Sequence, residues 1–288
     1  MWADIIKYII LFGILHSSIY MVFSLGFSLI FGVAKIPHLA YGALFTMSAY
    51  LSYIFLTSLG LNPWISMVVA VLVVALLNLI IGDVIVKPSL KMPVSVFIST
   101  FAVAYIVEEV FRIELGLTPI TLPSLSGVTI IWGVPVNNQW FLVLLISIFM
   151  SAFLLAFLRY TTTGKATRAV AESWEESMII GIDPLKVFRI TMFLSGVYAA
   201  TAGILLSPLK AVTPEMGWGP LFTAFAIIIL GGMGSIKGTI IASLIYGFVE
   251  QGITWTLGGA FAEIAPLILI IVTLIVRPTG LFGEEGRT

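Results

Sequence analysis

Long apolar runs recur along almost the whole chain, separated by short polar connections. A helix needs about 20 apolar residues to cross the hydrocarbon core of a bilayer. The runs therefore predict an all-α, polytopic integral membrane protein. About seven runs are long enough to span, at residues 5–31, 39–59, 64–86, 94–111, 140–158, 190–209 and 262–276. The first run has no basic segment before it and no small-residue cleavage site, which indicates a retained span.

A further apolar region, residues 221–252, is interrupted by the sequence GGMGSIKG at residues 231–238, the glycine turn. The arm on each side has about 10 to 14 residues, too few to cross the bilayer alone. This pattern predicts a broken or re-entrant helix pair. Two interpretations of Gly231, Gly232 and Gly234 stay open: they line a solute path, or they let helices pack closely.

Gly32, His38 and Gly42 mark a second place where helices could open, between the first two predicted spans. Glycine permits backbone conformations and close approaches that other residues avoid. His38 is interpreted as structural rather than catalytic, because neither of the two histidines has partners at metal-ligand spacing. With the glycine turn, these three residues are the candidates for a translocation pathway or for helix breaks.

One long polar insert, the elbow (residues 160–189), interrupts the apolar pattern. Ser173, followed three positions later by Glu176, predicts a capping box in which each side chain accepts from the other residue's backbone N–H. Gly181 is suited to end that helix, and Asp183 before a proline predicts the start of the next one. We therefore expect a defined helix-turn-helix rather than a slack loop.

The elbow is also the natural place for a soluble partner to dock. Its first part, KATRAVAE at residues 165–172, is small and helix-prone, so Ala166, Ala169 and Val170 are expected to be available to a partner's groove. From the pattern alone, a solvated amphipathic surface loop explains the same residues. Capping signals mark a helix without identifying what touches it.

The basic residues indicate an orientation, because cytoplasmic loops carry an excess of Lys and Arg. If the elbow is cytoplasmic, ten of the 14 basic residues face the cytoplasm, including Lys35, Lys87, Lys91, Arg277 and Arg287. The N-terminus is then outside and the C-terminus cytoplasmic. Residues 116–138, which contain the β-prone run TIIWGV, fall outside and predict an extracytoplasmic cap or short hairpin.

Composition narrows the function classes. The chain has 288 residues, 60% hydrophobic and 10% charged, with 14 basic and 14 acidic side chains. This balance provides no basic patch for nucleic acid, and the absence of cysteine removes thiolate chemistry. The glycine turn lacks the Gly-Lys-Ser/Thr of a P-loop, and the sequence has no H-E-x-x-H or G-x-S-x-G motif. We expect one transmembrane domain over residues 1–288, no catalytic or metal site, and no cofactor bound by this chain.

Ionisable residues inside spans are costly and usually functional. A spacing of four predicts two anchoring pairs near helix ends, Asp83 with Lys87 and Glu108 with Arg112. Glu250 is interpreted either as solvated at the rim or as a solute contact. No series of mid-bilayer acids suggests a proton relay or an ion-selective ring.

Several neutral polar residues also lie within the predicted spans. They either line a wetted path or form interhelical hydrogen bonds. These residues are Ser28, Asn78, Ser99, Thr100, Ser151, Ser195 and Tyr198.

Four stretches together resemble the permease subunits of branched-chain amino-acid ABC importers. They are FGVAKIPHLAYGALFTMSAYL (31–51), GKATRAVAESWEESMIIGIDPLKVFRITMFLSGVYAATAGILLSP (164–208), ILGGMGSIKGTIIASLIYGFVE (229–250) and VRPTGLFG (276–283). They follow one another in the order found in that family, and the resemblance covers nearly the whole chain. Residues 35–38 depart from it, reading Lys-Ile-Pro-His where relatives more often carry an Asn-Phe-Ala-His type of sequence.

The resemblance implies partners and a role for the elbow. In that family the equivalent loop is the coupling element that sits on the ATP-binding subunit. The implied assembly holds two cytoplasmic ATPases with their ATP and Mg²⁺, a second homologous permease and an extracytoplasmic solute-binding protein, in the cytoplasmic (inner) membrane of a prokaryote. The candidate ATPase-coupling residues are Ala166, Arg168, Ala169, Glu172, Glu176, Gly181 and Ile182.

The expected function is therefore the permease subunit of an ATP-driven importer that works by alternating access. Its expected solutes are branched-chain or other hydrophobic amino acids. Because the family also includes transporters of urea and short amides, those solutes are an alternative. A stand-alone small-solute channel or ion-coupled carrier is another; it would explain the helix breaks but would leave the elbow without a role.

Overall fold

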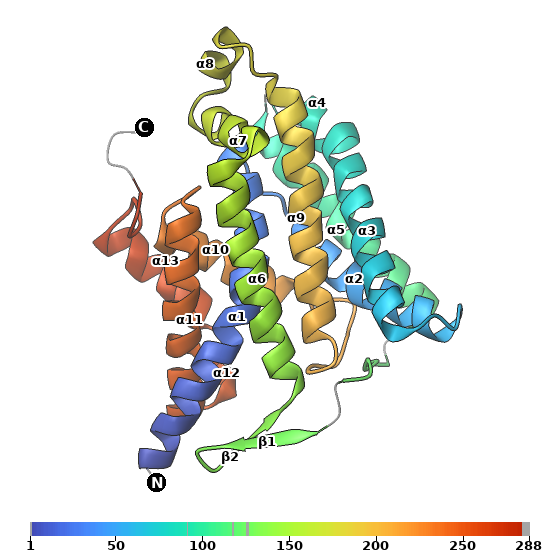
Figure 1. Cartoon of the computed structure of the whole chain (residues 1–288), viewed down its shortest axis with the longest axis vertical. Helices are drawn as coiled ribbons and strands as arrows, with labels where there is room; N and C mark the ends of the chain where they lie inside the picture. The colour runs from blue at the N-terminus through green and yellow to red at the C-terminus, as the bar shows by residue number, and fades with distance from the viewer. Residues whose placement is uncertain (1, 91, 117, 125–126, 284–288) are drawn as a thin grey trace.

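The protein is almost entirely helical apart from one small hairpin (Figure 1). The computed structural model describes residues 2–90, 92–116, 118–124 and 127–283, so Lys91 and Arg287 of the orientation argument lie outside the described residues. In chain order the elements are α1 (Trp2–Ala34), α2 (Ala40–Thr57), α3 (Pro63–Ile81), the π-helical turn η1 (Gly82–Val86), α4 (Lys87–Ser89), α5 (Pro93–Leu115), β1 (Val128–Ile131), β2 (Val134–Asn137), α6 (Gln139–Tyr160), α7 (Thr162–Glu172), α8 (Trp174–Ile179), α9 (Pro184–Leu206), α10 (Trp218–Gly231), α11 (Ile236–Thr256), α12 (Gly259–Ala262) and α13 (Ala265–Val276).

Fewer helices qualify as membrane spans than the apolar runs predict. Among the described residues, five helical stretches are long and apolar enough: α1, α3 with its continuation to Ser89, α5, α6 and α9. The bent pair α10–α11 brings the number to six, and the predicted seven are not confirmed. α13 has only 12 residues. α2 has 18 residues, carries polar side chains such as Ser48 and Ser52, and is largely buried among other helices.

The centre of the bundle is formed by α1, α2 and α9, which pack against one another and are flanked by α3, α5, α6 and α11. Phe23, Tyr41 and Tyr198 are fully buried there, and the Tyr41 hydroxyl donates to the Phe23 carbonyl oxygen at 3.0 Å. The outer helices α3, α5 and α6 expose many large apolar side chains. Such surfaces are suited to lipid or to an apolar partner.

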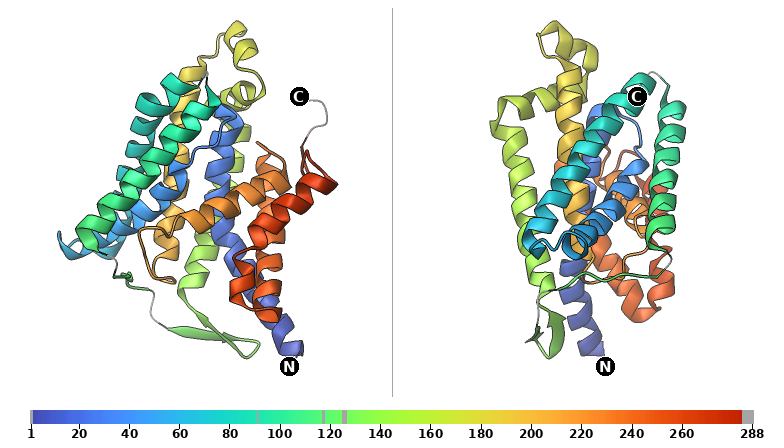
Figure 2. Two further views of the ribbon diagram at one scale, coloured as in Figure 1. Left: turned by 180° about the vertical axis from the view of Figure 1, so that it is seen from behind. Right: turned by 90° about the vertical axis from the view of Figure 1, so that its right-hand side faces the viewer.

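The predicted break at the glycine turn is present, but its two arms are unequal. α10 has 14 residues and α11 has 21, and their axes are bent by 118°. The expected length of 10 to 14 residues is correct for α10 and wrong for α11, because α11 continues through Gly252 to Thr256. Figure 2 shows α10 lying across the bundle while α11 runs along α1. α11 is therefore long enough to span, and α10 is a half-helix.

The predicted hairpin within residues 116–138 is confirmed. β1 and β2 pair antiparallel, and Trp132 and Gly133 turn between them with φ angles of 51° and 84°, as a tight two-residue hairpin turn requires. The hairpin lies at the same end of the molecule as the start of α1, whereas α7 and α8 lie at the opposite end (Figure 1). The two predicted extramembrane segments are thus separated by the full length of the bundle.

Candidate functional site

The elbow is built from capped helices, largely as its sequence predicts. The Ser173 hydroxyl accepts from the backbone N–H of Glu176 at 3.2 Å, and Gly181 adopts a φ of 82° after α8 ends. The Asp183 carboxylate accepts from the N–H of Leu185 at 3.0 Å, at the start of α9. The capping box is only half formed, because the Ser173 N–H donates to the carbonyl oxygen of Ala169 at 3.0 Å instead. Each turn is therefore fixed by short-range bonds.

The elbow is bonded to the end of α1. The Trp174 indole N–H donates to the Val33 carbonyl oxygen at 2.7 Å, and the Lys35 ammonium donates to the Glu172 carbonyl oxygen at 3.2 Å. Val33 and Val170 are buried together with Val187 of α9. A displacement of α7 and α8 would therefore be transmitted to the point where α1 ends.

The outward surface of the elbow differs from the predicted one. Val170 is fully buried, which corrects the expectation that it is available to a partner, and Ala166 and Ala169 are half-buried. Ile182 packs beside the buried valines. Four other candidates from the sequence are exposed: Arg168, Glu172, Glu176 and Gly181.

The sequence interpretation missed the apolar tip of the elbow, Met178, Ile179 and Ile180. These side chains are 55%, 84% and 70% exposed. The signal was present in the sequence as an apolar triplet directly before Gly181, outside every predicted span. Contiguous exposed apolar side chains mark a surface for a protein partner or for a membrane.

The glycine turn packs tightly against the chain around it. Gly232 and Gly234 have φ angles of 96° and 83°, a region that side-chain-bearing residues rarely adopt. Gly231 touches the Gly238 backbone, and a Cβ on Gly232 would lie 2.6 Å from the Gly283 nitrogen. Gly234 lies against Gly32 of α1. Gly32 and Gly234, two of the predicted break residues from separate parts of the sequence, thus lie next to each other.

His38 lies in a polar network at the connection between α1 and α2. Its side chain is buried, and its Nε2 lies 3.0 Å from the Asn78 Oδ1. The Asn78 amide also donates to the Met192 carbonyl oxygen at 2.6 Å and to the Ser195 hydroxyl at 2.9 Å. These bonds tie the connection to α3 and α9, and they support the structural interpretation of His38.

Most of the neutral polar residues form hydrogen bonds between helices. Thr239 of α11 bonds the Ser28 hydroxyl at 3.1 Å, and the Tyr198 hydroxyl donates to the Met150 carbonyl oxygen at 2.7 Å. Ser151 contacts the Met21 sulfur at 3.1 Å. Of the two interpretations in the sequence, this geometry favours interhelical bonding.

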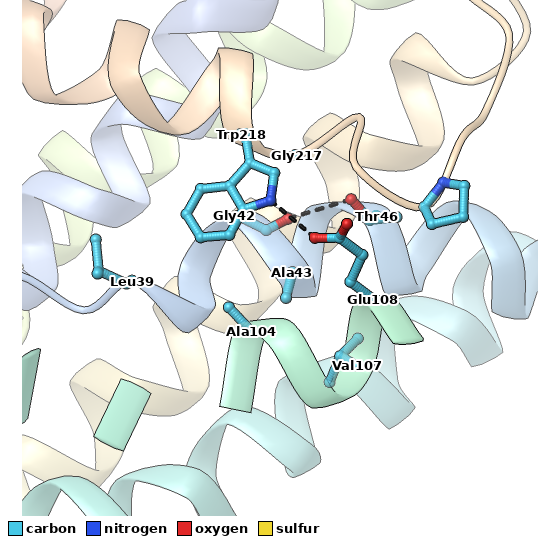
Figure 3. Close-up of a pocket in the computed structure, with 10 residues that line it drawn as sticks. Leu39, Gly42, Ala43, Thr46, Ala104, Val107, Glu108, Gly217 and Trp218 are labelled. Carbon is cyan, nitrogen blue, oxygen red and sulfur yellow. Dashed lines mark hydrogen bonds between the residues drawn. The ribbon is translucent and has the colours of Figure 1, made fainter. Parts of the chain in front are cut away.

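The Gly42 region forms one wall of a pocket between α2, α5 and the start of α10. Gly42 and Gly217 touch through their backbones, since a Cβ on Gly217 would lie 2.0 Å from the Gly42 oxygen. Figure 3 shows Glu108 pointing toward Trp218 and Thr46, with Leu39 and Ala104 on the other side. The lining residues are Leu39, Gly42, Ala43, Thr46, Ala104, Val107, Glu108, Pro214, Gly217 and Trp218.

Charged groups gather at the polar end of this pocket. The predicted Glu108–Arg112 pair is confirmed at 2.5 Å, and the Trp218 indole N–H donates to the second Glu108 oxygen at 2.9 Å. Arg112 also lies 3.6 Å from Glu109 and 3.9 Å from Glu215. The pocket combines a half-buried carboxylate with apolar walls, and a single sequence motif could not have predicted it.

Two other charged contacts differ from the sequence interpretation. Asp83 pairs with Arg189 of α9 at 2.8 Å, so the predicted partner Lys87 is wrong. Glu250 accepts from the Tyr20 hydroxyl at 2.7 Å, and the His16 Nδ1 lies 3.5 Å from its other oxygen. Both acidic residues connect helices that are distant in sequence, and spacing along one helix cannot reveal such partners.

Comparison with known sequences gives a consistent family signal. The family profile described as "Branched-chain amino acid transport system / permease component" matches residues 9–276. LivH of Escherichia coli (strain K12), a high-affinity branched-chain amino acid transport system permease protein, is 25% identical over 288 residues, which cover 94% of each chain. A probable LivH of Methanocaldococcus jannaschii is 29% identical over 294 residues, covering 96% of this chain and 92% of the relative. The ribose import permease RbsC of Escherichia coli (strain K12) is 23% identical, covering 92% and 84%.

One solved structure shares the fold. A chain in the complex of PsaBC from Streptococcus pneumoniae with a Fab matches with a TM-score of 0.57, covering 98% of both chains. Its sequence identity is 11%, so the likeness concerns the arrangement of the helices alone. The match extends over nearly all of the fold.

Proposed function

The chain belongs to the family of permease components of branched-chain amino acid transport systems, and from that premise we propose that it carries a branched-chain amino acid. It is a multi-pass membrane protein and a permease subunit of an ABC importer. The names of the LivH relatives support the choice of solute. The ribose permease is a more distant relative with a different solute, which is why the choice needs a direct transport measurement.

We propose that the elbow docks a cytoplasmic ATP-binding subunit, which holds ATP and Mg²⁺. The observation that carries this proposal is the exposed apolar tip, Met178 to Ile180, on a helix whose ends are both capped. Apolar side chains on a rigid helix can bind in a hydrophobic groove of a partner protein and anchor the helix there. Arg168, Glu172 and Glu176 of the same elbow are exposed as well, and polar side chains are typical of the rim of a protein interface.

In the proposed orientation the elbow is cytoplasmic, the start of α1 lies outside, and the chain ends in the cytoplasm of a prokaryotic cell. Five basic residues at the elbow end support this choice: Arg159, Lys165, Arg168, Lys186 and Arg189. The hairpin and the loop before α10 then face the outside, where a solute-binding protein would approach. A second permease completes the pathway.

The contacts of the elbow suggest how partner movement reaches the pathway. The hydrogen bond from Trp174 to Val33 would transmit movement of α8 to α1. The end of α1 touches the glycine turn through Gly32 and Gly234, and this turn joins the half-helix α10 to α11. ATP-driven movement of the partner would therefore shift the balance between outward-facing and inward-facing arrangements.

The test is a pair of matched substitutions in the complete importer. Ile179→Ser removes the most exposed apolar side chain of the tip, and we expect it to reduce copurification of the ATPase and to abolish leucine uptake into vesicles. Ile6→Ser changes an apolar side chain that is 54% exposed at the opposite end of the molecule, and it should leave ATPase binding intact. Normal uptake and normal ATPase recovery with Ile179→Ser would refute elbow docking.

A further inference from the structure

The pocket between α2, α5 and α10 has no part in the coupling route described above. Its lining residue Pro214 belongs to the loop before α10, and Val212 of that loop pairs with Ile120 in the segment that leads to the hairpin, which faces the outside in the proposed orientation. Glu108 belongs to α5, a helix long and apolar enough to span the membrane. Ionisable side chains inside such helices are costly and tend to mark functional positions. The Glu108 side chain is only 11% exposed.

The ion-pair group around Glu108, the one of its carboxylates that lines the pocket, carries surplus negative charge. Ion pairs link Arg112 to three carboxylates, those of Glu108, Glu109 and Glu215, at distances of 2.5, 3.6 and 3.9 Å. One guanidinium compensates one carboxylate, so this group has a net charge of about −2. A cationic group entering the pocket would be attracted to it, and an anion would be repelled.

Glu108 retains capacity to bind another donor. Its two oxygens accept one bond each, from Arg112 and from the Trp218 indole N–H. An ionised carboxylate offers about four lone-pair sites, so about two remain. An ammonium group carries three donors and can use such sites with charge-assisted hydrogen bonds.

The lining also includes the apolar side chains of Leu39, Ala104 and Val107. A carboxylate beside apolar walls matches a molecule with an ammonium group and an aliphatic side chain. In this conformation the pocket is nearly closed, with a volume of about 10 Å³, enough for about one water molecule. Gly42 and Gly217 are in contact there, so separation of the start of the half-helix α10 from α2 would open the pocket.

We propose that this pocket is a solute-contact site of the permease, in which the Glu108 carboxylate receives the ammonium group of a zwitterionic aliphatic amino acid. The inference rests on the proposed function, since it concerns the same transported solute. Glu108 acts by direct contact, and Leu39, Ala104 and Val107 contact the aliphatic side chain. The contact forms when the start of α10 moves away from α2 and α5.

The first test measures leucine uptake by the complete importer in proteoliposomes. Glu108→Gln keeps the shape and removes the charge, and we expect uptake to fall about tenfold to a hundredfold, with the ATPase still bound. Glu108→Asp keeps the charge and should restore part of the uptake. Glu114→Gln is the matched control, because Glu114 is an exposed carboxylate of the same helix that neither lines the pocket nor belongs to the three carboxylates paired with Arg112; it should transport normally.

The second test probes the site without relying on transport. The chain contains no cysteine, so Ala104→Cys introduces a single thiol at a pocket position that is 2% exposed. During ATP turnover, a cationic methanethiosulfonate reagent should label it faster than an anionic one. Glu108→Gln should reduce that preference, and leucine should slow the labelling.

The outcomes separate the two proposals. If the wild-type complex neither binds an ATPase nor takes up leucine, the proposed function fails. If it does both but Glu108→Gln transports normally, only the solute-contact site is refuted. The site is also refuted if Ala104→Cys stays unreactive during turnover, or if leucine does not slow its labelling.

Discussion

Trp174, the first residue of α8, donates its indole N–H to the carbonyl oxygen of Val33 in the last turn of α1, at a distance of 2.7 Å. The last four carbonyl groups of a helix have no partner within the helix. Trp174 therefore caps α1 from another element that lies 141 positions further along the chain. The bond makes the end of α1 dependent on the position of the elbow.

We expect Trp174→Phe to weaken coupling without removing the elbow's partner. Phenylalanine keeps the aromatic ring beside Phe188, whose ring centre is 6.4 Å away, but it cannot donate to Val33. The lost hydrogen bond costs about 1 kcal/mol, and the signature should be more ATP hydrolysed per leucine imported. Trp64→Phe, at an exposed tryptophan of α3, is the control. An unchanged ratio of ATP to leucine would show that this bond does not transmit movement.

The sequence predicted the elbow well because its structure is local. A cap depends on residues two or three positions apart, so Ser173 and Asp183 could be assigned to helix starts before their surroundings were known. Gly181 could likewise be assigned to the end of α8, because the positive φ that it adopts there is a local property that favours glycine. The hairpin at residues 128–137 is another short-range feature, since its register is set by the turn at Trp132 and Gly133.

Apart from the apolar tip of the elbow, the parts that sequence reasoning missed depend on residues far apart in the chain. The Asp83–Arg189 bond joins positions 106 apart, and Tyr20 and Glu250 are 230 apart. The pocket draws its walls from three separate segments around Gly42, Glu108 and Trp218. Apolar runs predict that helices exist, but they carry little information about which faces meet. The predicted count of seven spans is not confirmed for a related reason, since α2 is apolar and yet largely buried in protein.

Gly217→Ala should destabilise the closed contact between α10 and α2. The added Cβ would lie 2.0 Å from the Gly42 oxygen, a backbone atom that cannot move aside cheaply. Overpacking of this kind costs about 1–3 kcal/mol, so the midpoint of thermal unfolding in detergent should fall. Gly219→Ala is the matched control, because the described residues leave the space around its Cβ open within 4 Å. Equal stability of both variants would contradict the tight contact.

A double-mutant cycle tests which partner Asp83 uses. The Arg189 guanidinium lies 2.8 Å from Asp83, whereas the sequence alone had suggested Lys87. Both side chains of the pair are partly exposed, at 48% and 28%, so the effect should be small, about 1–3 °C in the unfolding midpoint. It should shrink further in high salt, because screening weakens exposed pairs.

The cycle distinguishes Arg189 from Lys87 as the partner of Asp83 by asking whether the effects of two substitutions on the unfolding midpoint add up. Asp83→Asn and Arg189→Gln should each lower the midpoint, and the double variant should lose little more than either single one, since the same interaction is removed each time. Asp83→Asn combined with Lys87→Gln should instead give the sum of the two single effects. Coupling with Lys87 and additivity with Arg189 would reverse the assignment. It would also mean that η1 is held to α9 by packing, such as the contact of Gly82 with Met192, while the hydrogen bonds of Asn78 still join α3 to α9 nearby.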